Sequence, residues 1–174
     1  MIIIGYPGVC KSVASQKFIQ VIDLDSSCIW TEENELTKKM NGFNIDFNTY
    51  CNIAESLSKQ GYIVCVSSHF DVQYILRKST EQVYVCYPSK EIKRQWISFL
   101  RKRYVEDSSE SNLKSLNHVI SDFDFDIEDM ENSGFDAIEL NDGKFLSDVL
   151  QESFDNAIAE QEVEEVENES EDNK

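Results

Sequence analysis

Short apolar segments alternate with segments of helical period along the first 150 residues, and this alternation constrains the fold more than any other feature. The segments at 2–4, 21–25, 62–66, 82–87 and 137–140 are predicted strands. The one at 62–66 is apolar throughout, as expected of a strand buried on both faces. Because helical segments separate successive strands, the sequence predicts an α/β fold with a parallel sheet.

Apolar side chains recur at helical spacing between these strands. The segment after the fourth strand is the clearest case, since Ile92, Trp96, Phe99 and Leu100 form one apolar stripe. Gly61 is placed to end the helix before the third strand. We expect helices over 11–20, 48–60, 71–77, 89–103, 112–120 and 124–132, and a last helix that begins near Leu146.

The chain is strongly acidic, with 33 Asp and Glu against 16 Lys and Arg and a formal net charge of −17. This charge disfavours attraction to nucleic acid or to an anionic membrane surface. No apolar run approaches the roughly 20 residues that span a bilayer, and no secretory signal precedes Gly5. The sequence therefore predicts a cytoplasmic protein, or one of the host cytoplasm if phage-encoded, without a membrane or nucleic-acid partner.

The five cysteines are widely spaced and form no CxxC pair. Cys65 and Cys86 lie inside apolar strand-like segments, where a free thiol behaves as a small apolar side chain. Neither a disulfide framework nor a zinc site is expected from this pattern. Free thiols agree with a reducing cytoplasm.

Acidic residues are concentrated at the C-terminus. Residues 151–174 hold 10 Asp and Glu and one Lys. From about Glu160 onward, apolar side chains are too few to offset the entropy of ordering, so we expect a disordered tail. The sequence thus divides into a folded domain over residues 1–150 and, over 151–174, a helix end followed by a tail that is interpreted as solubilising rather than docking.

The carboxyl end of the first strand carries GYPGVCKS, residues 5–12, and a helical segment follows at once. In this strand–loop–helix setting, G-x-x-x-x-G-K-[ST] is the phosphate-binding P-loop. Its backbone N–H groups surround the phosphates, its lysine contacts the β- and γ-phosphates, and its hydroxyl holds Mg²⁺. The sequence therefore predicts that ATP is bound by Gly5, Gly8, Val9, Cys10, Lys11 and Ser12. Lys11 is also expected to be catalytic, and Ser12 is also expected to be a magnesium ligand.

Cys10 stands where this motif has its second glycine. Backbone approaches phosphate closely at that position and usually needs a positive φ, which glycine adopts freely. A Cβ there costs about 1–2 kcal/mol if the left-handed conformation is required. Two interpretations stay open: a variant loop that binds nucleotide, and a plain strand-to-helix turn or decayed site.

A basic helix is the second feature that favours phosphoryl transfer. Lys90, Arg94 and Arg101 share a face of the helix after the fourth strand, and Arg103 lies at its end. Cations stabilise the charge that develops on a transferred phosphoryl group, and guanidinium binds phosphate bidentately. We expect Arg94, Arg101 and Arg103 to be catalytic residues of a lid; the alternative is a solvated face balanced by nearby acids.

Polar residues follow the second and third strands. Asp25 lies at the carboxyl tip of the second strand, where a carboxylate can order Mg²⁺-bound water or contact an acceptor nucleotide. Asp23 points to the same side, deeper in the strand. Ser67 and His69 end the third strand and are expected to contact substrate, although a simple helix-approach role stays open for His69. The G-x-S-x-G elbow of a hydrolase is absent.

The segments IIIGYPGVCKS, VIDLDSS, GYIVCVSSH, VYVCYPSKEIKRQW and FLSDVL resemble the small P-loop nucleotide kinases of phages and their bacterial hosts, which are adenylate- and thymidylate-kinase-like. The resemblance spans residues 1–150. It implies a three-layer P-loop NTPase fold with a five-stranded parallel sheet of order 2-3-1-4-5, ATP and Mg²⁺ as donor, and a (deoxy)nucleoside monophosphate as acceptor. It also implies donor-side roles for Lys11 and Ser12, an acceptor-side role for Asp25, and lid roles for the three arginines.

Three functional hypotheses follow. The first is phosphotransfer from ATP to a nucleoside monophosphate. The second, motivated by Cys10 and the acidic tail, is a nucleotide-binding or interaction protein that kept the fold and lost activity. The third is a kinase of another small molecule or of a polynucleotide 5′ end, and the net charge of −17 disfavours the polynucleotide.

Overall fold

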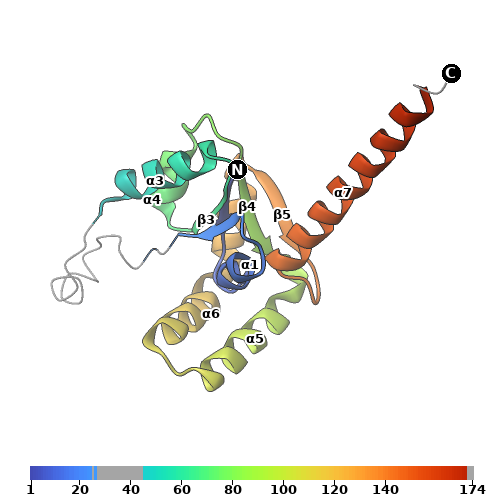
Figure 1. The fold of residues 1–174 in the computed structure, drawn as a ribbon. Helices are drawn as coiled ribbons and strands as arrows, with labels where there is room; N and C mark the ends of the chain where they lie inside the picture. The colour runs from blue at the N-terminus through green and yellow to red at the C-terminus, as the bar shows by residue number, and fades with distance from the viewer. Residues whose placement is uncertain (25, 27–44, 172–174) are drawn as a thin grey trace.

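A sheet of five parallel strands forms the centre of the protein, as a computed structural model that describes residues 1–24, 26 and 45–171 shows (Figure 1). The strand order is β2-β3-β1-β4-β5. The α/β class, the parallel sheet and this order are as expected from the sequence. The strands are β1 (Ile2–Gly5), β2 (Val21–Asp23), β3 (Ile63–Ser67), β4 (Val83–Pro88) and β5 (Asp136–Leu140).

The central position of β1 explains its run of isoleucines. Ile3 pairs with Cys65 of β3 on one side and with Tyr84 of β4 on the other. Helices cover both faces of a strand in this position, so it has no polar face. Every residue of β1 is accordingly buried, whereas the edge strand β5 exposes Asp136 and Glu139.

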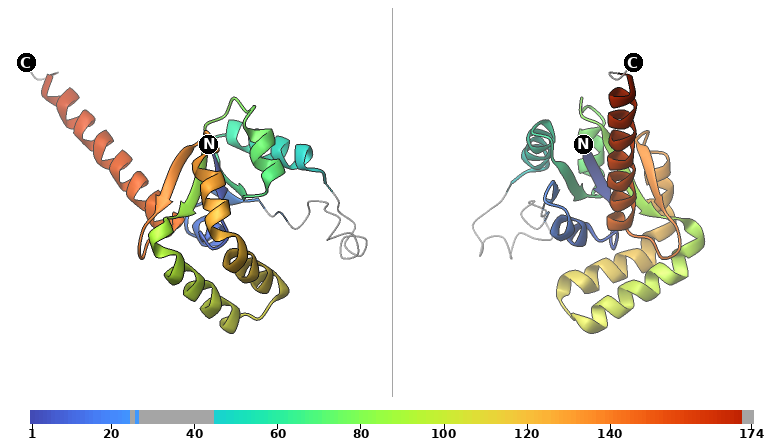
Figure 2. Two further views of the ribbon diagram at one scale, coloured as in Figure 1. Left: turned by 180° about the vertical axis from the view of Figure 1, so that it is seen from behind. Right: turned by 45° about the vertical axis from the view of Figure 1, so that its right-hand side comes forward.

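Helices cover both faces of the sheet. α1 (Lys11–Lys17) and α7 (Leu146–Glu171) pack together on one face. α3 (Phe47–Lys59), α4 (Phe70–Leu76) and α6 (Glu110–Glu131) lie on the other, which Figure 2 shows from behind. Right-handed crossovers produce this division, because the chain moves toward β2 through α1 and back toward β5 through the other helices.

A helical hairpin extends beyond the carboxyl edge of the sheet (Figure 1). The turn η3 (Lys90–Ile92) leads from β4 into α5 (Lys93–Glu106), which packs against α6. α6 is a single helix, so the prediction of two helices over 112–120 and 124–132 is wrong. Ser121 lies at the expected break, but its hydroxyl donates to carbonyl groups within the helix and leaves the helix continuous.

α7 differs from the expectation for the C-terminus. Its packed part includes Phe154, whose ring lies 5.0 Å from that of Phe18. The helix then continues to Glu171 and projects away from the sheet (Figure 1), whereas we expected helical structure to end near Glu160. Glu, Gln and Ala are good helix formers, which an argument from apolar content alone does not weigh. The start of this helix at Leu146 agrees with the expectation from the sequence.

Within the described ranges, no helix combines the length and the apolar character that crossing a membrane requires. The fully buried side chains include those of β1, and the three largest come from the segment after β1, from α3 and from α6. These three are Tyr6, Tyr50 and Phe123. The core thus reaches the residues that follow β1, at the carboxyl edge of the sheet.

Candidate functional site

The carboxyl ends of β1 and β3 lie side by side, with Gly5 opposite Ser67. The β1–α1 loop, residues 6–10, and the segment 67–69 therefore share one edge of the sheet. Ligands of open parallel sheets bind at this edge, because loops there separate around a topological switch point. The site residues predicted from the sequence are therefore expected at the carboxyl ends of β1 and β3.

Cys10 has a left-handed backbone, with φ 65° and ψ 45°, at the N-cap of α1. It is the one non-glycine residue with positive φ in the described part of the chain. The expectation that this position requires positive φ is confirmed. The Cys10 thiol lies 3.4 Å from the Gly8 carbonyl oxygen, and burial raises its pKa although the charge of Arg103 acts in the opposite direction.

The Lys11 side chain folds back over the start of the loop. Its Nζ donates a hydrogen bond to the Gly5 carbonyl oxygen at 3.0 Å. A Cβ on Gly5 would lie 2.8 Å from Lys11 Cδ and 2.9 Å from Val9 Cγ2, so no larger residue fits beneath the lysine. Burial lowers the pKa of Lys11, whereas the carboxylate of Asp23 in β2 raises it. The loop therefore encloses a lysine that reaches the carboxyl edge.

Two carbonyl groups of the loop are bonded to other elements. Trp96 Nε1 of α5 donates to the Pro7 carbonyl oxygen at 3.0 Å, and the Leu146 N–H of α7 donates to that of Val9 at 3.2 Å. Across a trans peptide, the C=O and the next N–H point in opposite directions, and the described residues contain no cis peptide bond. The N–H groups of Gly8 and Cys10 therefore point away from Trp96 of α5 and from Leu146 of α7.

α5 is packed tightly on this loop. Gly8 has φ +92°, and a Cβ on it would lie 3.1 Å from both Trp96 Nε1 and Leu100 Cδ2. The first N–H groups of a helix have no partner inside the helix, so those of α1 extend the donors of the loop. Successive N–H groups in such turns form an anion-binding concavity.

The three predicted lid arginines are placed differently around α5. Arg103 lies seven residues after Trp96, and thus on the same side of the helix; its charge acts on both Cys10 and Lys11. Arg94 and Arg101 are rotated by roughly 140–160° from Trp96, since each residue turns the helix by about 100°. All three are exposed. The structure brings Arg103 toward the loop and leaves Arg94 and Arg101 on the outer side of α5.

The lysines of this basic segment are paired with acids of α6. Lys90 Nζ lies 2.6 Å from Glu131 Oε2, and Lys93 Nζ lies 2.6 Å from Asp124 Oδ2. Lys90 belongs to η3 rather than to α5, so the expected α-helical face shared with Arg94 is not formed. For these two lysines, balance by nearby acids is the interpretation that fits.

Ser67 and His69 form the other half of this edge. Ser67 Oγ lies 2.7 Å from His69 Nδ1, and the Phe47 ring of α3 lies 5.8 Å from the His69 ring. The Tyr50 hydroxyl donates to the Leu24 carbonyl oxygen at 2.8 Å and accepts from the Ser67 N–H at 3.2 Å. α3 therefore ties the ends of β2 and β3 together beside the loop, a role that helical spacing alone does not reveal.

The proposed metal ligands are only partly placed. Ser12 is exposed in the first turn of α1, and Asp25 lies outside the described residues. Among residues 1–24, 26 and 45–171, no group of three or more His, Cys, Asp or Glu side chains is arranged to hold a metal ion. Mg²⁺ usually binds through one or two protein groups, substrate phosphates and water. The Ser12 hydroxyl fits an ion of that kind, carried by a nucleotide.

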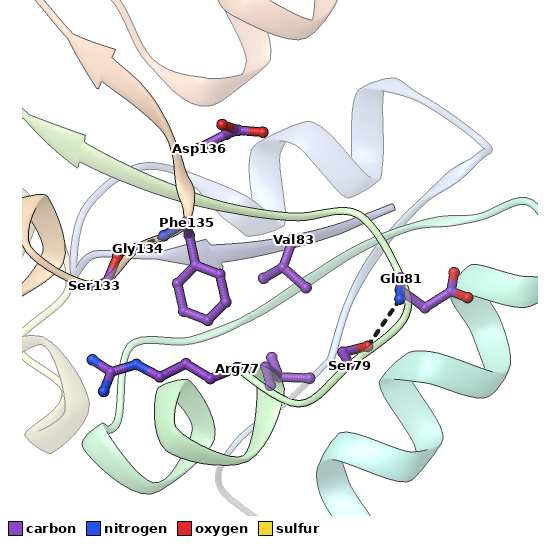
Figure 3. Close-up of a pocket in the computed structure, with 9 residues that line it drawn as sticks. Arg77, Ser79, Glu81, Val83, Ser133, Gly134, Phe135 and Asp136 are labelled. Carbon is purple, nitrogen blue, oxygen red and sulfur yellow. Dashed lines mark hydrogen bonds between the residues drawn. The ribbon is translucent and has the colours of Figure 1, made fainter.

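A hollow of about 250 Å³ lies at the opposite, amino edge of the sheet (Figure 3). Figure 3 shows Phe135 and Val83 at its centre and Arg77 at its side. Glu81 and Asp136 and the C-terminal end of α4 contribute negative charge there, which disfavours a polyphosphate. No residue predicted as a site residue lines this hollow.

The structure thus gathers the β1–α1 loop, Lys11, Arg103 and the segment 67–69 at one edge of the sheet. Concave backbone donors with a lysine and an arginine suit an anionic ligand that has several oxygens. Comparison of the chain with models of protein families, with curated proteins and with solved structures found no match.

Proposed function

We propose that the chain is a phosphotransferase that binds ATP at the β1–α1 loop and transfers the γ-phosphate to a (deoxy)nucleoside monophosphate. The left-handed backbone of Cys10 beside Lys11 is the observation that carries this proposal. Together with the spacing of Gly5, Lys11 and Ser12, it supports a variant P-loop. The strand order and the place of the loop after the central strand agree with that assignment.

On the donor side, the N–H groups of the loop and of the first turn of α1 bind phosphate oxygens. Lys11 exchanges its bond to the Gly5 carbonyl for the β- and γ-phosphates, which place further negative charge beside a partly buried cation that already feels the Asp23 carboxylate. Arg103 stabilises charge on the transferred group from the side of α5. A bound Mg²⁺ neutralises phosphate charge, and the Ser12 hydroxyl holds it. Positioning and electrostatics suffice, without a covalent intermediate.

On the acceptor side, the segment 67–69 lies next to the donor phosphates because Gly5 and Ser67 are neighbours in the sheet. The Ser67 hydroxyl orients the His69 ring, and the Phe47 ring flanks it. A polar ring beside an aromatic ring suits a nucleotide, which offers both a phosphate and a stacking surface. Asp25, the other acceptor-side candidate, follows β2 at the same edge.

A nucleotide-binding protein with little turnover is the second candidate, and Cys10 favours it. The Cys10 side chain occupies a strained left-handed position inside the loop, where a glycine would leave more room for phosphate. α5 also presents one arginine to the loop rather than three. Binding and transfer therefore have to be measured separately.

The experiment is a thermal-shift panel of nucleotides with Mg²⁺, followed by a phosphotransfer assay on each acceptor that stabilises the protein. Lys11→Ala is compared with Lys59→Ala, which removes an exposed lysine at the end of α3. We expect ATP with Mg²⁺ to stabilise the wild type and Lys59→Ala by RT ln(1 + [L]/Kd), and Lys11→Ala much less. Equal stabilisation of all three proteins would contradict the proposed donor site.

A further inference from the structure

Tyr6 connects the β1–α1 loop with α6. Its backbone is held at both ends, since its N–H donates to the Cys86 carbonyl oxygen at 2.9 Å and its own carbonyl accepts from the Val9 N–H at 3.3 Å. Its side chain is fully buried, with the ring packed edge-on against Phe123 of α6 at 5.9 Å. Tyr6 is the first residue of the loop, so a shift of its buried side chain also shifts the backbone at the start of the loop.

Asp126 lies three residues after Phe123, on the side of α6 that the Tyr6 ring packs against, and its carboxylate acts on the Tyr6 hydroxyl. His118 Nε2 lies 2.9 Å from Asp126 Oδ2, and His118 Nδ1 lies 3.3 Å from Asp122 Oδ2. A neutral imidazole has one N–H, so only the doubly protonated ring donates to both carboxylates. Hydrogen bonding to Asp126, together with both carboxylate charges, raises the pKa of His118.

Tyr6 OH and Asp126 Oδ2 are both buried without a hydrogen bond of standard geometry in the described part of the chain, although Asp126 Oδ2 keeps its ionic contact with His118. Burial raises the pKa of Tyr6, and the carboxylate of Asp126 raises it further, so the phenol stays protonated as a potential donor. Buried polar groups are normally bonded. Because the Tyr6 hydroxyl and the Asp126 carboxylate lack such a bond, their contact is one that can form or break when the loop moves.

We propose that Asp126 is a positioning residue for the β1–α1 loop, that it acts through Tyr6, and that His118 makes this positioning depend on pH. Protonated His118 holds the Asp126 carboxylate against the Tyr6 hydroxyl, and Tyr6 holds the loop. When His118 loses its proton, Asp126 loses its cationic partner and the region gains negative charge. Both effects weaken the binding of an anion at the loop, and this part of the inference rests on the proposed function.

The polar and charged side chains that the neighbouring helices direct at α6 bind other residues than His118 and Asp126. Lys93 of α5 is paired with Asp124 on the next face of α6. On the side of α4, Gln73 Nε2 donates to Asp129 Oδ2 at 3.3 Å. Asp122 and Asp126 are thus the carboxylates that face His118, and Tyr6 is the loop residue that faces Asp126.

The test measures Kd for ATP with Mg²⁺ between pH 6 and pH 8.5, together with hydrogen exchange of the 5–13 segment in the free protein. ATP itself titrates near the lower end of this range, so the wild type is compared with His118→Gln at each pH. We expect wild-type affinity to fall, relative to His118→Gln, by about two- to fivefold as pH rises, because a partly exposed pair contributes modestly.

Asp126→Asn should weaken ATP binding at low pH, should show a smaller pH dependence than the wild type because His118 then titrates beside Asp122 alone, and should speed exchange of the 5–13 segment. Glu128→Gln, an exposed carboxylate on the same helix, is the matched control and should change none of these. In a Tyr6→Phe background, Asp126→Asn should cause no further change in the Kd for ATP or in the exchange of the 5–13 segment.

Unchanged loop exchange and an unchanged pH profile in Asp126→Asn would overturn the positioning role. If ATP binds no variant at any pH, the proposed function fails, but exchange in the free protein still decides whether Asp126 and His118 control the loop. A pH dependence of exchange that persists in His118→Gln would also contradict the inference.

Discussion

The β1–α1 loop at the carboxyl edge and the turns at the amino edge both contain residues with positive φ, but they differ in what surrounds those residues; Gly143, after β5, resembles the turns of the amino edge. At the carboxyl edge, Gly8 is packed against Trp96 and Leu100, and Cys10 takes a left-handed conformation with a side chain. At the amino edge, Gly61 and Gly134 also have positive φ, yet no described atom lies within 4 Å of the place where a Cβ would be. A glycine with positive φ carries no strain by itself, whereas the left-handed Cys10 does, and it is held in a loop on which α5 is packed.

Replacement of Gly8 should show the largest effect of this difference. Gly8→Ala adds the left-handed penalty of about 1–2 kcal/mol and an overpacking penalty of about 1–3 kcal/mol against Trp96 and Leu100. Gly61→Ala should cost only the first term, about 1–2 kcal/mol. Urea denaturation of the two variants measures the difference, and equal losses would show that the loop tolerates displacement.

The Trp96 hydrogen bond should come next. Trp96→Phe leaves the Pro7 carbonyl without its donor and should cost about 1–3 kcal/mol, with weaker ATP binding. Tyr84→Phe, which removes an exposed hydroxyl that bonds Gln82, is the control and should cost less than about 1 kcal/mol. Chemical denaturation and calorimetric titration test both; full ATP affinity in Trp96→Phe would mean that α5 does not hold the loop.

Cys10→Gly should act in the opposite direction. Removing the Cβ relieves about 1–2 kcal/mol of left-handed strain, part of which the greater freedom of glycine in the unfolded chain offsets. We expect ATP binding to tighten by roughly tenfold, which is about 1.4 kcal/mol. Cys10→Ala keeps the Cβ and should not gain affinity, so titration of both variants separates strain from thiol chemistry. A gain in Cys10→Ala as large as in Cys10→Gly would contradict the strain argument.

Truncation after Glu160 should have the smallest effect. The last packed aromatic contact of α7 described here is that of Phe154 with Phe18, and the removed part of the helix projects away from the sheet (Figure 1). The melting temperature should change by less than ~2 °C, since a segment so poor in apolar residues has little surface to bury. Differential scanning calorimetry measures this, and a larger drop would show that the acidic segment docks on the protein.

Local sequence patterns predicted what depends on local physics. The run Ile2–Ile4 indicated a strand, which the structure has, and the left-handed backbone considered for Cys10 at the glycine position is present. The spacing along α5 also predicted its buried stripe, with Trp96 and Leu100 in the core.

Long-range contacts could not be predicted in this way. The bond of Trp96 to Pro7 and the approach of Asp126 to Tyr6 depend on how α5 and α6 fold back over the loop, which no periodicity encodes. The prediction that three arginines of the basic segment act together did not hold for the same reason, because their spacing does not show which side of α5 faces the loop. Arg103, at the end of the segment, is on that side.

Hydrogen–deuterium exchange with and without ATP and Mg²⁺ tests the central claim most directly, because it reads both edges of the sheet in one experiment. We expect slower exchange of the 5–13 segment on addition of nucleotide, loss of that protection in Lys11→Ala, and unchanged exchange at 77–83 and 133–136 around the hollow of Figure 3. Protection at the hollow with none at the loop would contradict the central claim.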